Sequence, residues 1–214
     1  MITPATINAL RTALTLIIFT ALGTGLLAYT FDITKDNIAR NEAQAKRELI
    51  QQALPQSLYD NDVAQDAVQL PPTPELGTTF ASHAYRARLG GAPAALVLEA
   101  IAPDGYSGKI NLLIAIQSNG KVVGVRVVSH KETPGLGDYI EIAKSVWIKQ
   151  FDHATLGPDA AAWQVKKDGG RFDYMSGATI TPRAVVKAVH KALRYYEQHG
   201  NAIFAQPTIS QEPP

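Results

Sequence analysis

The sequence predicts an α+β fold, in which one N-terminal transmembrane helix precedes a domain with a mainly antiparallel sheet and packed helices. Three observations support this prediction. Residues 12–31 carry no charged side chain. The middle of the chain alternates like short strands around an Asn-Gly turn. Residues 181–200 have the apolar periodicity of an amphipathic helix.

The uncharged stretch of residues 12–31 is long enough to span a bilayer. A helix of that length covers roughly 30 Å at 1.5 Å per residue. Arg11 precedes the stretch, and Tyr29 and Phe31 lie where aromatic rings suit the interface. A cleaved signal peptide is the alternative, but the stretch exceeds a usual signal core and no A-x-A site follows it. We therefore expect a retained single-pass anchor in contact with membrane lipid.

The charges around the span give only a weak indication of orientation. Arg11 and the amino terminus precede the span, whereas several Lys and Arg follow it, mixed with acidic residues. Counted literally, the positive-inside rule leaves the C-terminal domain inside. Large domains translocate despite such local charges.

Residues 34–54 predict a helix that ends at Pro55, either separate or continuing the membrane helix as a stalk. Residues 55–78 contain four prolines and read as a loop. The predicted organisation is a short N-terminal segment (1–11), the membrane helix (12–31), a helical stalk and linker (32–78), a domain (79–200) and a flexible tail (201–214).

Within the domain, the pattern predicts strands and then helices. The expected strands are residues 80–89, 94–102, 109–117 and 121–130, with turns at 103–105 and at 118–120. Residues 138–151 look helical. The clearest helix has Thr181 as N-cap, Pro182 at its first position and Gly200 as its stop.

Composition excludes several classes of function. Twenty Lys and Arg nearly balance nineteen Asp and Glu, so a formal charge of +1 gives no reason to expect nucleic acid as a partner. The chain has no cysteine. A disulfide framework, a cysteine nucleophile and a thiolate-held iron–sulfur cluster are therefore excluded. Any redox role must depend on an organic cofactor or a non-thiolate metal.

Two glycine-containing segments carry the chemistry. Residues 173–179, Asp-Tyr-Met-Ser-Gly-Ala-Thr, end in four small residues directly before the last helix. Small residues let a ligand approach the backbone, and a helix N-terminus favours a phosphate, by contact or as an ester of the Thr179 hydroxyl. Residues 132–137, Glu-Thr-Pro-Gly-Leu-Gly, form an exposed turn able to line a flat ring. Considered alone, each segment also fits an ordinary tight turn.

Together these segments resemble a known family. D-x-x-S-G-A-T is the flavinylation motif of proteins that carry FMN through a threonine phosphoester, and residues 173–179 match it at each specified position. E-T-P-G-L-G and Gly105-Tyr106-Ser107-Gly108 look like two further markers. With the N-terminal anchor, the chain resembles the G subunit of the Rnf (or Rsx) ion-translocating electron-transport complex over residues 1 to about 200. The related C subunit of the sodium-pumping NADH:quinone reductase is typically longer, which favours the Rnf family.

The resemblance implies an FMN-binding domain with covalent FMN on Thr179. Its phosphoryl threonine makes the chain a phosphoprotein in the chemical sense. Asp173 would open the motif, with a role in recognition or in positioning magnesium during transfer. The other residues implied to bind or shape the cofactor site are Ser176, Gly177, Ala178, Glu132, Thr133, Gly135, Leu136, Gly137 and Ser107.

The resemblance also implies how the protein works. It would relay electrons in a bacterial inner-membrane complex that couples ferredoxin and NAD redox chemistry to ion transport, without a complete active site of its own. Its partners would be the other membrane subunits and the flavin transferase that attaches FMN. The family places the flavin outside the cytoplasm, so the domain is expected on the periplasmic side, against the literal charge count.

Other functions find less support in the sequence. Ser107 and Ser176 lie beside glycines, but neither is part of a G-x-S-x-G or S-x-x-K motif of serine hydrolases. The five histidines are widely spaced and show no H-x-x-x-H pattern, so no metal site is expected. A membrane-anchored scaffold without flavin remains the non-redox alternative.

Overall fold

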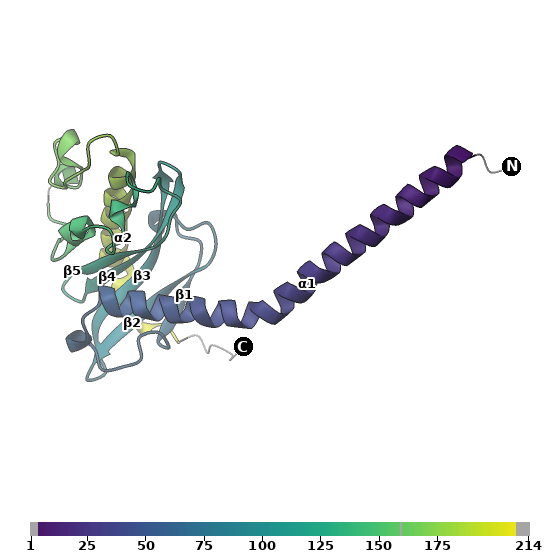
Figure 1. Cartoon of the computed structure of the whole chain (residues 1–214). Helices are drawn as coiled ribbons and strands as arrows, with labels where there is room; N and C mark the ends of the chain where they lie inside the picture. Colours follow the sequence, from purple (N-terminus) through teal and green to yellow (C-terminus); the bar gives the residue numbers. More distant parts are fainter. Residues whose placement is uncertain (1–3, 159, 209–214) are drawn as a thin grey trace. The chain divides into compact units, whose positions relative to one another are not determined.

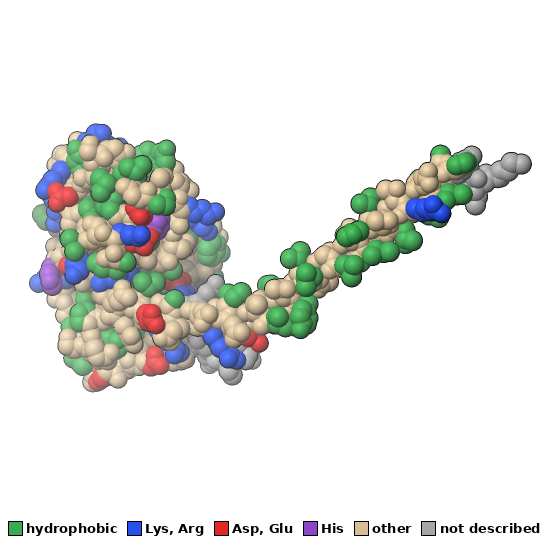
Figure 2. Space-filling model, viewed as in Figure 1, with side chains coloured by type: hydrophobic (Ala, Val, Ile, Leu, Met, Phe, Trp, Pro, Cys, Tyr) green, Lys and Arg blue, Asp and Glu red, His purple; other side chains and the backbone are tan. Residues whose placement is uncertain are grey.

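The computed structural model describes residues 4–158 and 160–208, and its first element is the helix α1 (Pro4–Ala53). By length and composition α1 is a candidate membrane span, with a mean hydropathy of 1.8 over its most apolar window. Figure 2 shows hydrophobic side chains along this part of the helix, with charged side chains near each end. The predicted helix at residues 34–54 is part of the same continuous helix as the candidate span.

The chain from Lys46 onward forms its own compact unit around a five-stranded antiparallel sheet in the order β1-β2-β3-β4-β5 (Figure 1). The strands are β1 (Ala67–Leu70), β2 (Ser82–Leu89), β3 (Ala92–Gly105), β4 (Gly108–Gln117) and β5 (Val122–Ser129). Consecutive strands pair because short turns join most of them, including the Asn119-Gly120 turn, where Gly120 has φ +80°. This confirms the predicted α+β class and antiparallel sheet.

Both faces of the sheet are covered, because successive side chains along a strand point to opposite faces. Leu96, Leu98 and Ile114 belong to the core that includes the helix α2 (Ile180–Ala205). Val97 and Leu113 face the opposite way and pack with Ile50, at the end of α1, and its neighbours. The apolar stripe predicted for α2 is buried in the first core: Val185, Val186, Val189 and Leu193, with Tyr196 packed against it.

Three local predictions were wrong. The loop predicted at residues 55–78 contains β1 and two short 3-10 helices, η1 (Gln56–Leu58) and η2 (Pro74–Leu76). The turn predicted at residues 103–105 belongs to β3, and the chain reverses at Tyr106 and Ser107. The α-helix predicted at residues 138–151 is two 3-10 helices, η3 (Asp138–Ile140) and η4 (Val146–Phe151), because Glu141 is extended at ψ 134° and interrupts the helical backbone.

The last helix continues beyond its predicted stop at Gly200 and ends at Ala205. Gly200 is buried, and a Cβ there would lie 2.8 Å from the Tyr196 ring. The glycine therefore makes room for a side chain one turn earlier rather than ending the helix. Of the predicted flexible tail, residues 209–214 lie outside the described residues. Two further short 3-10 helices, η5 (Ala160–Ala162) and η6 (Lys166–Asp168), precede α2.

The end of α1 is joined to the sheet by a carboxylate on β3. Glu99 accepts hydrogen bonds from Lys46 Nζ (2.9 Å) and from the Tyr85 hydroxyl (2.9 Å), and its other oxygen accepts one from the backbone N–H of His83 (2.9 Å). Burial alone would raise the pKa of Glu99. Hydrogen bonds from His83, Lys46 and Tyr85 and the charge of Lys46 outweigh it and lower the pKa from 4.5 to about 2.

The lowered pKa of Glu99 predicts that the stability of the fold depends on pH. Because the pKa of Glu99 is lower in the folded state, its ionised carboxylate stabilises the fold fully above pH 4.5. This stabilisation is lost as the pH falls through about 2. The contribution at pH 7 is on the order of 3 kcal/mol. We expect Glu99→Gln to lower the free energy of urea unfolding at pH 7, with the gap to the wild type narrowing markedly at pH 2.5. An equal gap at both pH values would contradict this assignment.

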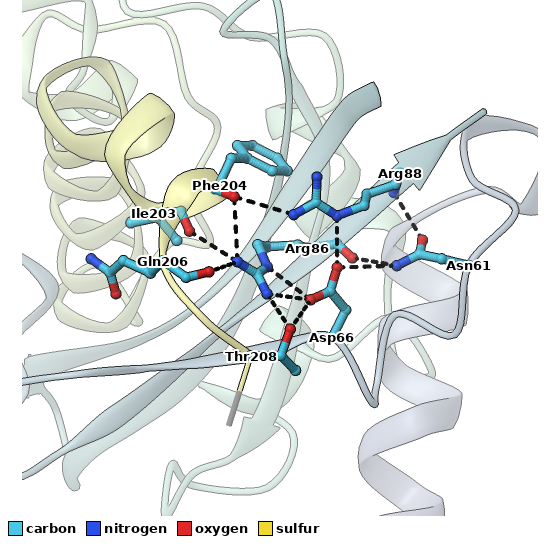
Figure 3. A network of polar contacts seen from close by, with 8 residues as sticks. All are labelled: Asn61, Asp66, Arg86, Arg88, Ile203, Phe204, Gln206 and Thr208. Atoms are coloured by element: carbon cyan, nitrogen blue, oxygen red, sulfur yellow. Dashed lines mark hydrogen bonds and ion pairs between the residues drawn. The ribbon is translucent and has the colours of Figure 1, made fainter. Parts of the chain in front are cut away.

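A buried arginine on β2 holds the C-terminal end of α2 (Figure 3). Arg86 is 2% exposed and donates to the backbone carbonyls of Ile203 (3.3 Å), Phe204 (3.4 Å) and Gln206, at the C-terminal end of α2. Its Nε donates to Asp66 (2.9 Å). The carbonyl of Ile203 also accepts the N–H of Gln206 (3.3 Å), and the guanidinium adds a side-chain cap to this end of the helix.

Asp66 completes the Arg86 network. Its second carboxylate oxygen accepts a hydrogen bond from Arg88 Nε at 2.8 Å, and Thr208 donates its hydroxyl at 2.9 Å. Burial opposes ionisation of Asp66, but hydrogen bonds from Arg88, Arg86 and Thr208 prevail and lower its pKa. The network therefore ties β2 and the segment before β1 to the end of α2.

Candidate functional site

A cavity of about 300 Å³ lies at the N-terminal end of α2. Three segments surround it: the β3–β4 turn, the loop that follows β5, and the small residues that lead into α2. Its lining consists of Tyr106, Glu132, Thr133, Leu136, Gly137, Gly177, Ala178, Thr179, Ile180 and Thr181. The two glycine-containing segments singled out in the sequence therefore face one cavity.

The loop after β5 contains a tight turn at its Thr-Pro-Gly-Leu residues. The N–H of Leu136 donates to the carbonyl of Thr133 at 3.1 Å, and Gly135 has φ +77°. Proline followed by a glycine of positive φ is the pattern of a type II turn. The buried Asp138 accepts a hydrogen bond from the N–H of Gly135 at 2.8 Å. The Asp138 carboxylate therefore fixes the turn, and the Leu136 side chain is exposed at the cavity.

The segment before α2 contains a second turn of the same kind. The N–H of Ala178 donates to the carbonyl of Met175 at 3.0 Å, and Gly177 has φ +85°. The Tyr139 hydroxyl lies beneath it, accepting from the N–H of Met175 and donating to the carbonyl of Ala178, both at 3.3 Å. Burial raises the pKa of Tyr139 and keeps this donor protonated.

Residues of η4 hold the beginning of the same segment. Trp147 Nε1 donates to the carbonyl of Asp173 at 2.7 Å, and Gln150 accepts from its N–H at 2.7 Å. The Trp147 ring also meets that of Tyr139 edge to face, with centroids 5.5 Å apart. The small residues before α2 are therefore presented by a rigid aromatic support.

The helix α2 begins at Ile180, so its N-cap lies two residues before the predicted cap, Thr181. Thr179 occupies the N-cap position, and its side chain makes no capping hydrogen bond. Thr181 is 1% exposed and donates its hydroxyl to the carboxylate of Glu132 instead. The prediction was wrong because this buried acceptor, distant in sequence, outcompetes the local capping role. The half-buried Thr179 hydroxyl is consequently available at the cavity.

Glu132 connects the three segments of the site. One carboxylate oxygen accepts from the N–H of Ser107 at 3.0 Å, in the β3–β4 turn, and the other accepts from Thr181 on α2. The backbone N–H of Glu132 donates to Nδ1 of His130 at 2.9 Å. Since Nδ1 is an acceptor, His130 carries its proton on Nε2 and donates it to Glu141 at 2.5 Å.

The structure brings most of the predicted site residues together. Glu132, Thr133, Leu136, Gly137, Gly177, Ala178 and Thr179 line the cavity. Asp173, Ser176, Gly135 and Ser107 belong to the same segments but are not among its lining residues. The carboxylate of Asp173 forms an ion pair with Lys166. Their proposed roles stay predictions.

Sequence reasoning did not select Tyr106, Ile180 and Thr181 as lining residues, nor Tyr139 and Trp147 as the support beneath them. Tyr106 lies inside the Gly-Tyr-Ser-Gly marker, so that marker could have indicated Tyr106 as a residue of the site. The aromatic support carries no local signal, because its hydrogen bonds join residues far apart in the sequence.

The residues present fit a flavin phosphoester. Thr179 offers a hydroxyl without a capping bond at a helix N-terminus, and a Cβ at Gly177 would meet nothing within 4 Å. Tyr106, Leu136 and Ile180 are large, exposed and apolar around the same cavity. Such surfaces suit a flat aromatic ring, and the cavity volume lies at the lower end of small-molecule sites.

Comparison with known proteins supports an FMN-binding domain. The family model described as "FMN-binding domain" matches residues 105–194, and that described as "RnfG N-terminal region" matches residues 1–53. A Pseudomonas aeruginosa protein, named as the G subunit of an ion-translocating oxidoreductase complex, is 48% identical over 199 residues, covering 92% of this chain and 93% of the relative. Relatives of the same name from Vibrio cholerae and Shewanella oneidensis are 44% identical, each covering 92% of this chain and 94% of the relative.

Proposed function

Because this chain belongs to the RnfG family, the G subunits of ion-translocating oxidoreductase complexes, we propose that it is the membrane-anchored flavoprotein of such an Rnf complex. In this proposal it carries FMN through a phosphoester on Thr179 and relays electrons between neighbouring subunits. The match of its first 53 residues to the RnfG N-terminal region favours this assignment over the C subunit of a sodium-pumping NADH:quinone reductase.

The placement of Thr179 is the observation that carries the proposal. Its hydroxyl is half-buried at the N-cap of α2, makes no capping bond and lines the cavity. In the attachment step Thr179 Oγ attacks the flavin phosphorus of a flavin dinucleotide, the phosphoanhydride bond breaks and a nucleoside monophosphate leaves with the hydroxyl proton. The modified chain then has the mass of chain plus FMN less one water. A flavin transferase would catalyse this step. The tether gives FMN a permanently high effective concentration at the site.

When bound, FMN supplies redox chemistry with one or two electrons. The residues of this chain bind and orient it. Tyr106, Leu136 and Ile180 offer apolar surface to the ring, and the two type II turns present backbone beside it. Tyr139 and Trp147 keep one of those turns rigid. A rigid site keeps the flavin at one distance from its electron donor and acceptor.

The candidate span in α1 supports a membrane anchor. We propose a single-pass protein of the bacterial inner membrane whose flavin domain is periplasmic and whose partners are lipid and the other membrane subunits. In such a complex, electron transfer between ferredoxin and NAD drives ion movement. A membrane-impermeant lysine reagent applied to intact spheroplasts would label the domain in this orientation. Labelling only after membrane disruption would refute it.

Mass spectrometry of the protein purified from its native membrane tests the central claim. We expect an FMN adduct, less one water, on the peptide that contains Thr179. The matched control is the same chain produced in cells without flavin transferase, which should be unmodified. No adduct in cells with an active transferase would refute covalent flavinylation and favour the scaffold function.

A further inference from the structure

The charge of the residues that line the cavity at the start of α2 is unusual for a phosphate-binding site. Among the described residues that line it there is one carboxylate, Glu132, and no Lys, Arg or His. Sites that bind phosphate by contact usually combine helix N–H groups with a basic side chain. Here the lining offers a negative charge instead, so free phosphate would be repelled.

Glu132 is built into the site. It is 4% exposed, and its two oxygens accept hydrogen bonds from Ser107 and Thr181. Two glycines make room for it: a Cβ at Gly105 would lie 2.9 Å from Oε1, and a Cβ at Gly137 would lie 2.9 Å from Oε2. Both partners are uncharged, so the charge of the carboxylate is not neutralised by a paired cation.

Four basic residues on the surrounding segments are paired with acidic ones, whereas the exposed Lys131, next to Glu132, forms no ion pair with the described residues. Each of four aspartates around the described site holds one Lys or Arg in an ion pair. The pairs are Lys187–Asp104 (2.6 Å), Arg183–Asp168 (2.6 Å), Lys144–Asp138 (3.9 Å) and Lys166–Asp173. These cations therefore contribute little net positive potential at the cavity.

We infer that Glu132 is a specificity-determining residue that prevents the site from recognising the flavin phosphate by charge. Its carboxylate takes the place of the anion that the N-terminus of α2 favours, through the Thr181 hydroxyl. Flavin is then held by contacts to its ring and by the ester alone. This inference rests on the proposed function. Its consequence is that free FMN does not fill the site before the transferase acts.

The test compares two flavins that differ in the phosphate. The full chain, produced without flavin transferase and kept in detergent micelles, is titrated with riboflavin and with FMN at low ionic strength, following flavin fluorescence. For the wild type we expect FMN to bind no more tightly than riboflavin. In Glu132→Gln the amide oxygen can still accept from the N–H of Ser107, and the amide NH2 can donate to the Thr181 hydroxyl, so the shape is kept and the charge is lost. The affinity for FMN relative to riboflavin should then rise about tenfold.

Glu197→Gln is the matched control, because it removes the same charge from an exposed position on α2, outside the cavity lining. In this variant the ratio of FMN affinity to riboflavin affinity should equal that of the wild type. A wild type that prefers FMN, an unchanged ratio in Glu132→Gln, or no FMN binding by that variant at any concentration reached would overturn the inference.

A second measurement needs no substitution and holds if Glu132→Gln fails to fold. Added salt screens charge repulsion, so in the wild type it should tighten FMN binding relative to riboflavin; weaker relative FMN binding in salt would overturn the inference. Both titrations use protein that carries no flavin ester on Thr179. Their failure is therefore distinct from a missing adduct in native membranes, which refutes the proposed function itself.

Discussion

Replacing Thr179 by alanine is expected to abolish covalent flavin attachment completely while changing the free energy of unfolding by less than about 0.5 kcal/mol. Alanine at an N-cap usually costs about 1 kcal/mol, because a capping hydrogen bond is lost. Thr179 makes no such bond, so the hydroxyl contributes chemistry rather than stability. In-gel flavin fluorescence and peptide mass spectrometry, after production together with flavin transferase, measure the attachment.

Thr133→Ala is the matched control for this prediction. Thr133 also lines the cavity, and its turn uses its backbone carbonyl, which the substitution retains. This variant should remain flavinylated. Flavin persisting in Thr179→Ala, on Ser176 or Thr181 for example, would show that the attachment site is elsewhere.

The largest loss of stability is expected for Arg86→Met, on the order of 3–5 kcal/mol, because it removes the fully buried partner of an ion pair and leaves Asp66 to the more exposed Arg88. The substitution removes the donor for Asp66 and for the carbonyls of Ile203 and Phe204, where α2 ends. Urea unfolding of the full chain in detergent micelles, followed by tryptophan fluorescence, gives the free energy of unfolding.

Arg88→Met provides the comparison for Arg86→Met. Arg88 lies on the same strand and also pairs with Asp66, but its side chain is 25% exposed. The expected loss is about 1 kcal/mol, as for a partly exposed pair. The double variant Asp66→Ala with Arg86→Met should lose less stability than the sum of the two single variants, because both substitutions break the same ion pair. Equal effects of the two arginine substitutions would contradict the role given to Arg86.

Local pattern was sufficient for much of the fold. The apolar span within α1, the strands β2 to β5 and the body of α2 were all predicted, because each depends on the periodicity of neighbouring residues. The Asn119-Gly120 turn was predicted for the same reason, since its geometry needs a positive φ at glycine. The short strand β1 was missed because four residues beside prolines carry too little pattern.

The motif residues of the candidate site were also apparent from the sequence, because a glycine turn before a helix is a local feature. The sequence did not show that residues 132–137 and 177–181 share one cavity with the β3–β4 turn. Their convergence depends on Glu132, whose hydrogen bonds reach Ser107 on one side and Thr181 on the other.

Long-range contacts also decided details that local rules predicted wrongly. Thr181 is of a residue type that favours the helix N-cap, and Gly200 of one that favours the helix C-terminus. Both are nevertheless buried residues within α2. A buried hydroxyl takes whichever acceptor is within reach, and a buried glycine leaves space for the ring that packs against it. The chain therefore specifies its elements through neighbours in sequence. The position of a reactive hydroxyl and the charge beside it arise only from partners that folding brings together.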